Sequence, residues 1–358
     1  MGLPEILIEF KAKAETAVSR SENGIVAVIL ADDTKTGDEF ASYKYNFEAD
    51  IIKAHWTTTN LDYLNKVFMG SPHRVLVERI GTEDDYEAAL ARLKNKQWNW
   101  LCIPDLETNK EQTSAIVNWV IAQRAAHKTF KAVLPCTAMN LRPNNEGIVD
   151  LATTGIKVGS RTYTAYAYCA RIAGLLAGLP MTESATYQVL PEIDSITESL
   201  TPDEDIENGK FILIDDGEKV KVGRGINSLA TLSCDKTEDM KKIKIIEGMD
   251  LIRDDIRSTF EKNYIGINNS YDNKVMFIAA VNQYFDGLVR DGILYDAADN
   301  SADINVEGQR AWLAERYDIS EYTDDKIRKA KTGSYVFVTA HITFVDAIED
   351  LKFTINME

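Results

Sequence analysis

The run Gly24-Ile25-Val26-Ala27-Val28-Ile29-Leu30 is apolar throughout and opens a region in which short apolar runs alternate with stretches of helical spacing. This alternation is typical of a layered βα domain, with helices packed on a parallel or mixed sheet. The sequence predicts strands at Ile25 to Leu30, Arg74 to Ile80, Trp98 to Ile103 and Lys131 to Pro135. Between them it predicts helices over Asp84 to Lys96 and Thr113 to His127, because their apolar residues recur on one helical face.

The most apolar stretch, Thr162 to Leu179, carries Arg171 in its middle and is rich in Ala and Gly. A charged residue at the centre is costly in a bilayer, so the stretch is interpreted as a buried core helix and not as a membrane span. Later strands are predicted at Tyr187 to Leu190 and in a hairpin of Phe211 to Ile214 with Lys219 to Val222. Asp216-Gly217 lies between the two hairpin strands and is a strong turn signal.

After about Asp235 the pattern changes to a short predicted strand at Ile243 to Ile246 and two long amphipathic helices, Gly248 to Asn263 and Asn273 to Arg290. The sequence therefore predicts an α/β fold in which a layered domain of residues 24–235 precedes a smaller α+β domain of residues 236–350. Residues 1–23 are expected to form an N-terminal arm and linker, and residues 351–358 a C-terminal arm.

Both arms alternate apolar and other residues, as a strand with one apolar face does. The apolar positions are Ile6, Ile8 and Phe10 at one end and Leu351, Phe353, Ile355 and Met357 at the other. Burial of four such side chains contributes about 6 to 12 kcal/mol. Ordering seven residues costs roughly 1 to 2 kcal/mol each, so ladder hydrogen bonds must tip the balance. For the C-terminal arm the sequence leaves two choices open, a hairpin with Tyr335 to Val345 or a strand on another subunit.

The chain has 56 acidic and 40 basic residues and a net charge of -16, which disfavours binding to nucleic acid or to anionic membrane surfaces. The acidic stretch Glu192 to Glu207 is predicted to be a solvated loop. Of the cysteines, Cys102, Cys136 and Cys169 lie in apolar surroundings and read as reduced core residues, and the chain begins without a signal-peptide pattern. The sequence therefore predicts a protein made in a reducing cytoplasm.

Motifs for catalysis and cofactor binding are missing from the sequence. It has no GxGxxG, no P-loop and no GxSxG nucleophile elbow, and a pairing of Cys136 with His127 is what chance provides among four Cys and four His. Asp296 to Gly308 lacks the spacing of a calcium loop, and the histidines do not form a zinc motif. No catalytic residue, cofactor site or metal site is therefore expected.

Five strings in order carry a family resemblance: VGRGINSL at 222–229, IIEGMDLIRDDI at 245–256, YIGINNS at 264–270, LVRDGI at 288–293 and VDAIEDL at 345–351. They resemble the C-terminal signature of contractile phage tail sheath proteins. The opening, Gly2-Leu3-Pro4-Glu5-Ile6, is similar to small sheaths of PBSX-like prophages and R-type bacteriocins.

This resemblance implies a structural subunit that polymerises helically around a tail tube and contracts, with its arms adding strands to neighbouring subunits. The implied partners are other copies of the chain, the tube protein, and baseplate and tail terminator proteins. The implied location is the bacterial cytoplasm during assembly and then a virion or bacteriocin tail. The C-terminal domain would face the tube, and Lys326, Arg328, Lys329 and Lys331 are the best basic cluster for that contact. The alternative from another class is an α/β enzyme, such as a hydrolase, whose catalytic residues are scattered.

Overall fold

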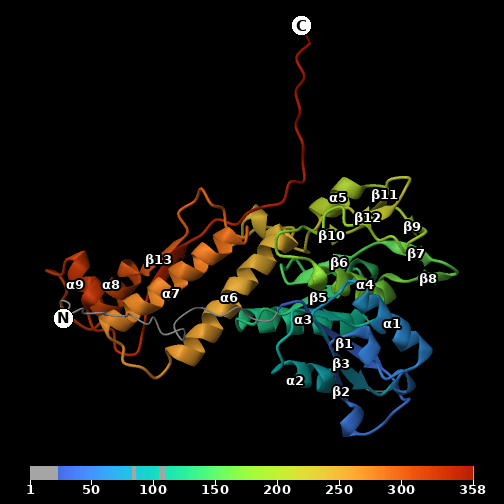
Figure 1. Ribbon diagram of the computed structural model, residues 1–358, viewed down its shortest axis with the longest axis horizontal. Helices are drawn as coiled ribbons and strands as arrows, with labels where there is room; N and C mark the ends of the chain where they lie inside the picture. Colours follow the sequence, from blue (N-terminus) through green and yellow to red (C-terminus); the bar gives the residue numbers. More distant parts are fainter. Residues whose placement is uncertain (1–22, 83–85, 105, 107–109, 358) are drawn as a thin grey trace, which may run out of the picture. The chain divides into compact units, whose positions relative to one another are not determined.

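A computed structural model describes residues 23–82, 86–104, 106 and 110–357 (Figure 1). Their contacts divide them into two compact units. One unit contains the described residues up to Leu251 together with the C-terminal segment from Asp346, and the other contains Ile252–Val345. The division falls inside helix α6 (Ile243–Asn263), whereas the sequence places the domain boundary near residue 235.

The first unit is built on a seven-stranded sheet in the order β10-β6-β5-β4-β1-β3-β2. All neighbouring strands are parallel except β2, which runs antiparallel to β3 at one edge. The strands are β1 (Ile25–Ala31), β2 (Ser42–Tyr45), β3 (Arg74–Ile80), β4 (Trp100–Cys102), β5 (Lys131–Leu134), β6 (Ile148–Leu151) and β10 (Lys210–Phe211). The four strands predicted from Ile25 to Pro135 are confirmed.

Helices cover both faces of this sheet, so alternate residues of β1 enter two different cores. Val26, Val28 and Leu30 pack with helices α1 and α4, whereas Ile25, Ala27 and Ile29 pack with α2 and α3. Burial on both faces explains why the sequence of β1 is apolar throughout. The four helices are α1 (Thr58–Phe68), α2 (Glu87–Leu93), α3 (Lys110–Ala125) and α4 (Ala165–Gly178).

Helix α4 confirms the predicted buried core helix. Every residue from Ala165 to Ala177 is buried. Arg171 is accommodated because its Nε donates a 2.6 Å hydrogen bond to Glu192. The sequence predicts that the whole acidic stretch from Glu192 is solvated, and for Glu192 this is wrong. Its carboxylate neutralises a buried guanidinium.

Smaller elements complete the first unit. Strands β7 (Thr154–Val158), β8 (Arg161–Tyr163) and β9 (Ser195–Thr197) form an antiparallel sheet, and β11 (Leu213–Asp215) pairs with β12 (Val220–Val222). The pair β11–β12 confirms the predicted hairpin, with Gly217 at φ 87° in its turn. The remaining helix of this part is α5 (Pro202–Glu207), and the 3-10 turns are η2 (Asp38–Phe40), η3 (Glu48–Asp50), η4 (Lys53–His55), η5 (Thr137–Met139) and η6 (Glu238–Lys241).

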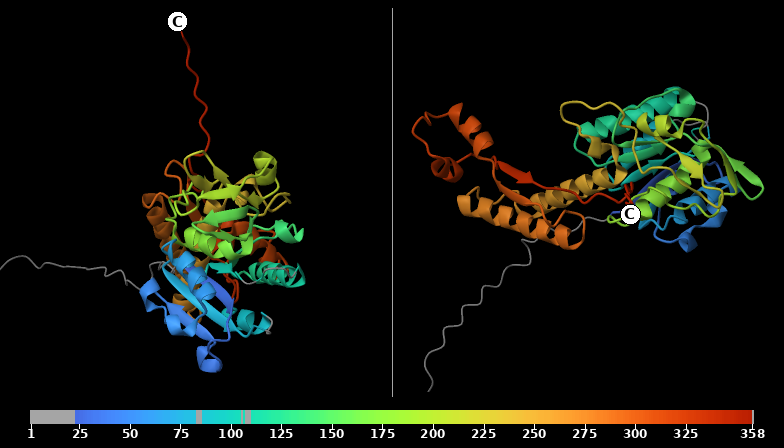
Figure 2. Two further views of the ribbon diagram at one scale, coloured as in Figure 1. Left: turned by 90° about the vertical axis from the view of Figure 1, so that its right-hand side faces the viewer. Right: turned by 90° about the horizontal axis from the view of Figure 1, so that it is seen from above.

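The second unit begins with the rest of α6, which packs against the antiparallel helix α7 (Tyr271–Arg290), as Figures 1 and 2 both show. Phe277 of α7 lies edge-to-face against Phe260, with ring centroids 5.2 Å apart. The Tyr284 hydroxyl donates a 2.6 Å hydrogen bond to the buried Asp255. The two predicted long amphipathic helices are thus confirmed, and they cover part of each other's apolar stripes. The unit also holds β13 (Ser301–Ile304), α8 (Val306–Ala314), α9 (Asp324–Lys329) and β14 (Val338–His341).

Two predicted strands are wrong. Ile243 to Ile246 form the first turn of α6, because their run continues into the helical stripe that follows and the side chains of Ile243, Ile245 and Ile246 are all buried in that form. Tyr187 to Leu190 form a loop with a single bridge from Val189 to Lys221. Tyr187 adopts φ 59°, a left-handed conformation that interrupts a strand.

Candidate assembly surfaces

The C-terminal arm presents the apolar residues that the sequence singled out. Leu351, Phe353, Ile355 and Met357 are 84%, 75%, 72% and 93% exposed, and residues 351–357 form no helix or strand in the single chain. Figure 1 shows this segment as an extended trace that leaves the rest of its unit. The single chain thus does not contain the alternative hairpin with Tyr335 to Val345, and these four apolar side chains stay exposed in it. Ile6, Ile8 and Phe10 lie outside the described residues, as does most of the expected linker.

A two-stranded ribbon in the second unit has one edge to which a further strand could pair. β13 and β14 are antiparallel, with Ser301 opposite His341 and Ile304 opposite Val338. Among the described residues neither strand pairs with a third, but Asn282 occupies the outward backbone groups of Ala302 in β13, so the open edge is that of β14. The ribbon is fixed to α7 by Asn282, whose side chain accepts from the Ala302 N–H at 2.7 Å and donates to the Ala302 carbonyl at 3.1 Å. It is therefore a firmly held, incomplete sheet.

The basic cluster predicted for tube contact lies on and after α9, which begins at the N-cap Thr323. Two of its cations already have acidic partners, since Arg328 pairs with Asp303 at 2.6 Å and Lys329 with Asp325 at 2.9 Å. The Lys326 ammonium lies 3.6 Å from the ring centroid of Tyr322, and Lys331 is exposed. Within the described part of the chain, neither of these two lysines forms an ion pair.

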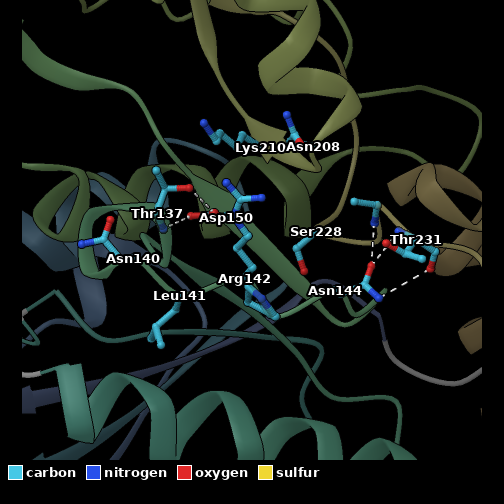
Figure 3. A pocket seen from close by; sticks show the side chains of 12 residues that line it. Thr137, Asn140, Leu141, Arg142, Asn144, Asp150, Asn208, Lys210, Ser228 and Thr231 are labelled. Carbon is cyan, nitrogen blue, oxygen red and sulfur yellow. Dashed lines mark hydrogen bonds between the residues drawn. The ribbon is translucent and has the colours of Figure 1, made fainter.

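A polar pocket of about 770 Å³ is lined by the segment between β5 and β6, by Asp150 of β6 and by residues at the start of β10 (Figure 3). At its floor the buried Asp150 accepts hydrogen bonds from the Thr137 N–H at 2.9 Å and the Thr137 hydroxyl at 2.6 Å. Burial raises the pKa of Asp150 to about 6, against the opposing effect of these hydrogen bonds. Most of the other lining residues are polar or basic, among them Arg142, Asn144, Asn208, Lys210 and Ser228. Asn144 is itself engaged, because its side-chain oxygen accepts from the N–H groups of Ala230 and Thr231.

The pocket does not assemble a nucleophile with a base. Its one carboxylate is held by Thr137, and neither cysteine nor histidine contributes to its lining. Burial also raises the pKa values of the thiols of Cys102, Cys136 and Cys169, which makes them poor nucleophiles. Among the described residues no group of His, Cys, Asp and Glu is placed to hold a metal ion, and no helix there could cross a membrane.

A buried ionic network fixes the start of α6 to the sheet of the first unit. Asp250 of α6 accepts hydrogen bonds from Arg124 of α3 at 2.9 and 3.3 Å and from Lys131 of β5 at 2.9 Å. Burial opposes ionisation of Asp250, but the two cations prevail and lower its pKa. One turn earlier, Glu247 pairs with Lys131 at 3.2 Å. Moving α6 away from α3 and β5 would leave these buried charges uncompensated, which is costly. The network therefore holds the first turns of α6 in the first unit.

The comparisons with known proteins agree with this picture. The family model for the phage tail sheath protein central domain matches residues 81–228, and that for the phage tail sheath C-terminal domain matches residues 235–358. The tail sheath protein of Clostridium phage phiCD119 is 32% identical over 369 residues, which cover 99% of each chain.

Solved structures share the fold at low sequence identity. The helical sheath of the anti-feeding prophage in its contracted state is 15% identical, with a TM-score of 0.72 and complete coverage of both chains. A chain in the baseplate structure of the same prophage is also 15% identical, with a TM-score of 0.66 and complete coverage of both. At this level of identity the likeness concerns the fold.

Proposed function

This chain belongs to the phage tail sheath family, and we propose from this premise that its subunits polymerise helically around a tail tube and contract. The chain is a structural subunit and not an enzyme, because the family relationship extends over almost its whole length. The alternative of an α/β hydrolase is set aside on that ground.

The observation that carries the proposal is the exposure of the C-terminal arm. Four large apolar side chains, all more than 70% exposed, cost free energy in water and regain it when they are covered. The open edge of β14 in a neighbouring copy can supply both cover and backbone hydrogen bonds, in the manner of strand addition. We therefore assign Leu351, Phe353, Ile355 and Met357 to an interface between subunits.

The N-terminal arm is assigned the same role through Ile6, Ile8 and Phe10, with residues 12–23 as its tether. A contact of this kind joins one surface of a subunit to a different surface of the next subunit. It therefore propagates without closing and produces an open helical tube. Contraction then needs two arrangements of rigid subunits, with the extended one metastable, and it needs no nucleotide.

The remaining partners follow from the geometry of such a tail. Residues 24–235 would form the outer domain, and residues 236–350 would face the tube through Lys326, Arg328, Lys329 and Lys331. Baseplate and terminator proteins would bound the sheath at its two ends, and the fold shared with a chain of the anti-feeding prophage baseplate structure supports the first of these. The chain would be made in the bacterial cytoplasm and then reside in the tail of a phage or an R-type bacteriocin.

Negative-stain microscopy of the purified protein tests the proposal. We expect striated tubes whose abundance rises with protein concentration and does not depend on an added cofactor. Deletion of residues 351–358 should leave a folded, dispersed protein that forms no tubes. As a matched control, replacing Lys352, Thr354 and Asn356 with Ser changes the other face of the arm and should permit assembly. Normal tubes from the deletion variant would contradict the role given to the arm.

A further inference from the structure

Two sequence strings that lie more than a hundred residues apart meet in the structure. VGRGI at 222–226 and residues 346–351 of the VDAIEDL string come together within the first unit, at Glu349. The carboxylate of Glu349 accepts hydrogen bonds from the Ser184 hydroxyl at 3.0 Å and from the Thr186 hydroxyl, and the Arg224 Nε lies 3.6 Å away. The side chain of Glu349 is only 6% exposed. Glu349 thus lies in a receptacle of two hydroxyl donors and one guanidinium, two residues before the exposed arm.

The receptacle is held in shape by its own hydrogen bonds. The Thr186 hydroxyl accepts from the Gly225 N–H at 2.9 Å, and the Ser184 hydroxyl accepts from the Thr186 N–H at 3.1 Å. A Cβ at Gly225 would lie 3.1 Å from both Ser184 Oγ and the Thr186 nitrogen, so this approach favours glycine. Gly225, the second glycine of the VGRGI string, therefore leaves room for the groups that bind the Glu349 carboxylate.

Two outer ion pairs flank the buried carboxylate. Arg224 Nη2 donates to Asp350 at 2.6 Å, a bond that raises the pKa of Arg224, and Lys242 pairs with Asp346. The side chains of Asp350 and Asp346 are 76% and 42% exposed, so water screens these pairs and each contributes little. Glu349 is buried and accepts charge-assisted hydrogen bonds, which are about twice as strong as neutral ones. It is therefore the principal contact of residues 346–350.

We propose that Glu349 is the fixed root of the C-terminal arm, and that Ser184, Thr186 and Arg224 form the clamp that holds it. The inference rests on the proposed function, in which residues 351–358 dock on a neighbouring subunit. With the clamp closed, the free tether is the seven residues from Leu351 to Met357, about 25 Å when extended. With the clamp open, it begins at Asp346 and reaches about 40 Å. The closed clamp thus fixes where and in which direction the arm leaves its subunit. Because the tether is shorter, it also raises the effective concentration of the arm at its site on the neighbouring subunit, about twofold for each contact between subunits.

The clamp can be tested on the full chain with an endoproteinase that cuts after glutamate. Cleavage at Glu349-Asp350 needs Glu349 to leave its receptacle, and mass spectrometry identifies the released peptide of residues 350–358. Thr186→Val removes the donor hydroxyl at nearly constant volume, and we expect cleavage at this bond to become about tenfold faster. Thr186→Ser keeps the hydroxyl and should behave as the wild type. The Thr186→Val variant should also need a several-fold higher protein concentration to form tubes.

The outcomes separate the clamp from the function on which it rests. Equal cleavage rates in the wild type and Thr186→Val would show that the clamp does not hold Glu349. Faster cleavage with tube formation at the wild-type concentration would show that the clamp does not position the arm. A wild type that forms no tubes would overturn the proposed function, while the cleavage rates would still judge the clamp. If Thr186→Val fails to fold, the test is amide hydrogen exchange of residues 346–350 in Glu349→Gln, which we expect to be faster than in the wild type. Glu207→Gln, at an exposed glutamate, is the control. Unchanged exchange in Glu349→Gln would overturn the clamp.

Discussion

Asp150 shows how one buried carboxylate can reduce stability at neutral pH. Burial raises its pKa from the ordinary 3.8 to about 6, so the folded protein binds the proton more tightly than the unfolded chain does. Between about pH 4 and pH 6 the folded state therefore carries more protons than the unfolded state, and the free energy of unfolding falls as the pH rises. The penalty is complete above about pH 6. A rise of this size corresponds to at most about 3 kcal/mol.

We accordingly expect Asp150→Asn to unfold at a higher denaturant concentration than the wild type at pH 7 and at a similar one at pH 4. The amide oxygen can still accept from the Thr137 N–H, and the amide nitrogen can donate to the Thr137 hydroxyl, so both hydrogen bonds survive. Asp203→Asn, on the exposed surface of α5, is the control and should show no such pH dependence. A stability difference that stays constant from pH 4 to pH 7 would contradict the assignment.

The residue scale also shows what the sequence could not reveal. The sequence shows Arg171 as a charge inside an apolar helix, but it predicts a solvated loop for its partner Glu192. Asp250 lies 126 and 119 residues from the two cations that it binds. Pairing over such distances is decided by the fold, and no local periodicity reports it. The same holds for Glu349 and its receptacle, although each of their two strings is recognisable in the sequence by itself.

At the scale of elements, local patterns predicted most of the first unit. Strands β1, β3, β4 and β5 and helices α3 and α4 follow directly from apolar runs and helical spacing. The start of α6 did not, because the run of Ile243, Ile245 and Ile246 is short and apolar, and periodicity alone cannot separate a buried strand from a buried helical turn. The ionic network at Asp250 is tertiary information that favours the helix.

The packing of α1 on α4 yields a prediction in which the usual effect of alanine is reversed. Alanine normally stabilises a helix interior by up to about 1 kcal/mol relative to glycine. A Cβ at Gly174 of α4, however, would overlap with the backbone carbonyl of Val67 in α1. Gly174→Ala should therefore force the two helices apart and destabilise the protein by about 1 to 3 kcal/mol.

Gly287→Ala in α7 is the matched control for Gly174→Ala. Its added Cβ would meet nothing closer than the end of Arg290 at 4.0 Å, so this variant should be neutral or slightly more stable. Thermal unfolding of both variants measures the contrast. If Gly174→Ala is as stable as the wild type, the two helices are not in the close contact described.

At the scale of the whole molecule, a contractile sheath must hold its tube and still release it. Contacts between charges suit this need because water and salt weaken them, whereas a buried apolar patch would resist sliding. The structure refines which lysines of the basic cluster are available for such contacts. Lys329 and Arg328 are engaged with Asp325 and Asp303. Lys326 and Lys331, which form no ion pair with another described residue, are better candidates for tube contact.

We therefore expect the double variant Lys326→Glu and Lys331→Glu to assemble poorly on purified tubes, most clearly at low salt. If these lysines meet acidic groups of the tube, reversed charges repel those groups, and low ionic strength lengthens the range of that repulsion. Lys53→Glu with Lys94→Glu is the matched control, since both lysines are exposed on the first unit. Each reversal changes the charge by -2, so both double variants move from -16 to -20 and differ only in where the charge lies. Co-sedimentation with tubes across a salt series measures the effect. Equal loss in both variants would mean that net charge alone governs assembly, and no loss in either would remove these lysines from the tube contact.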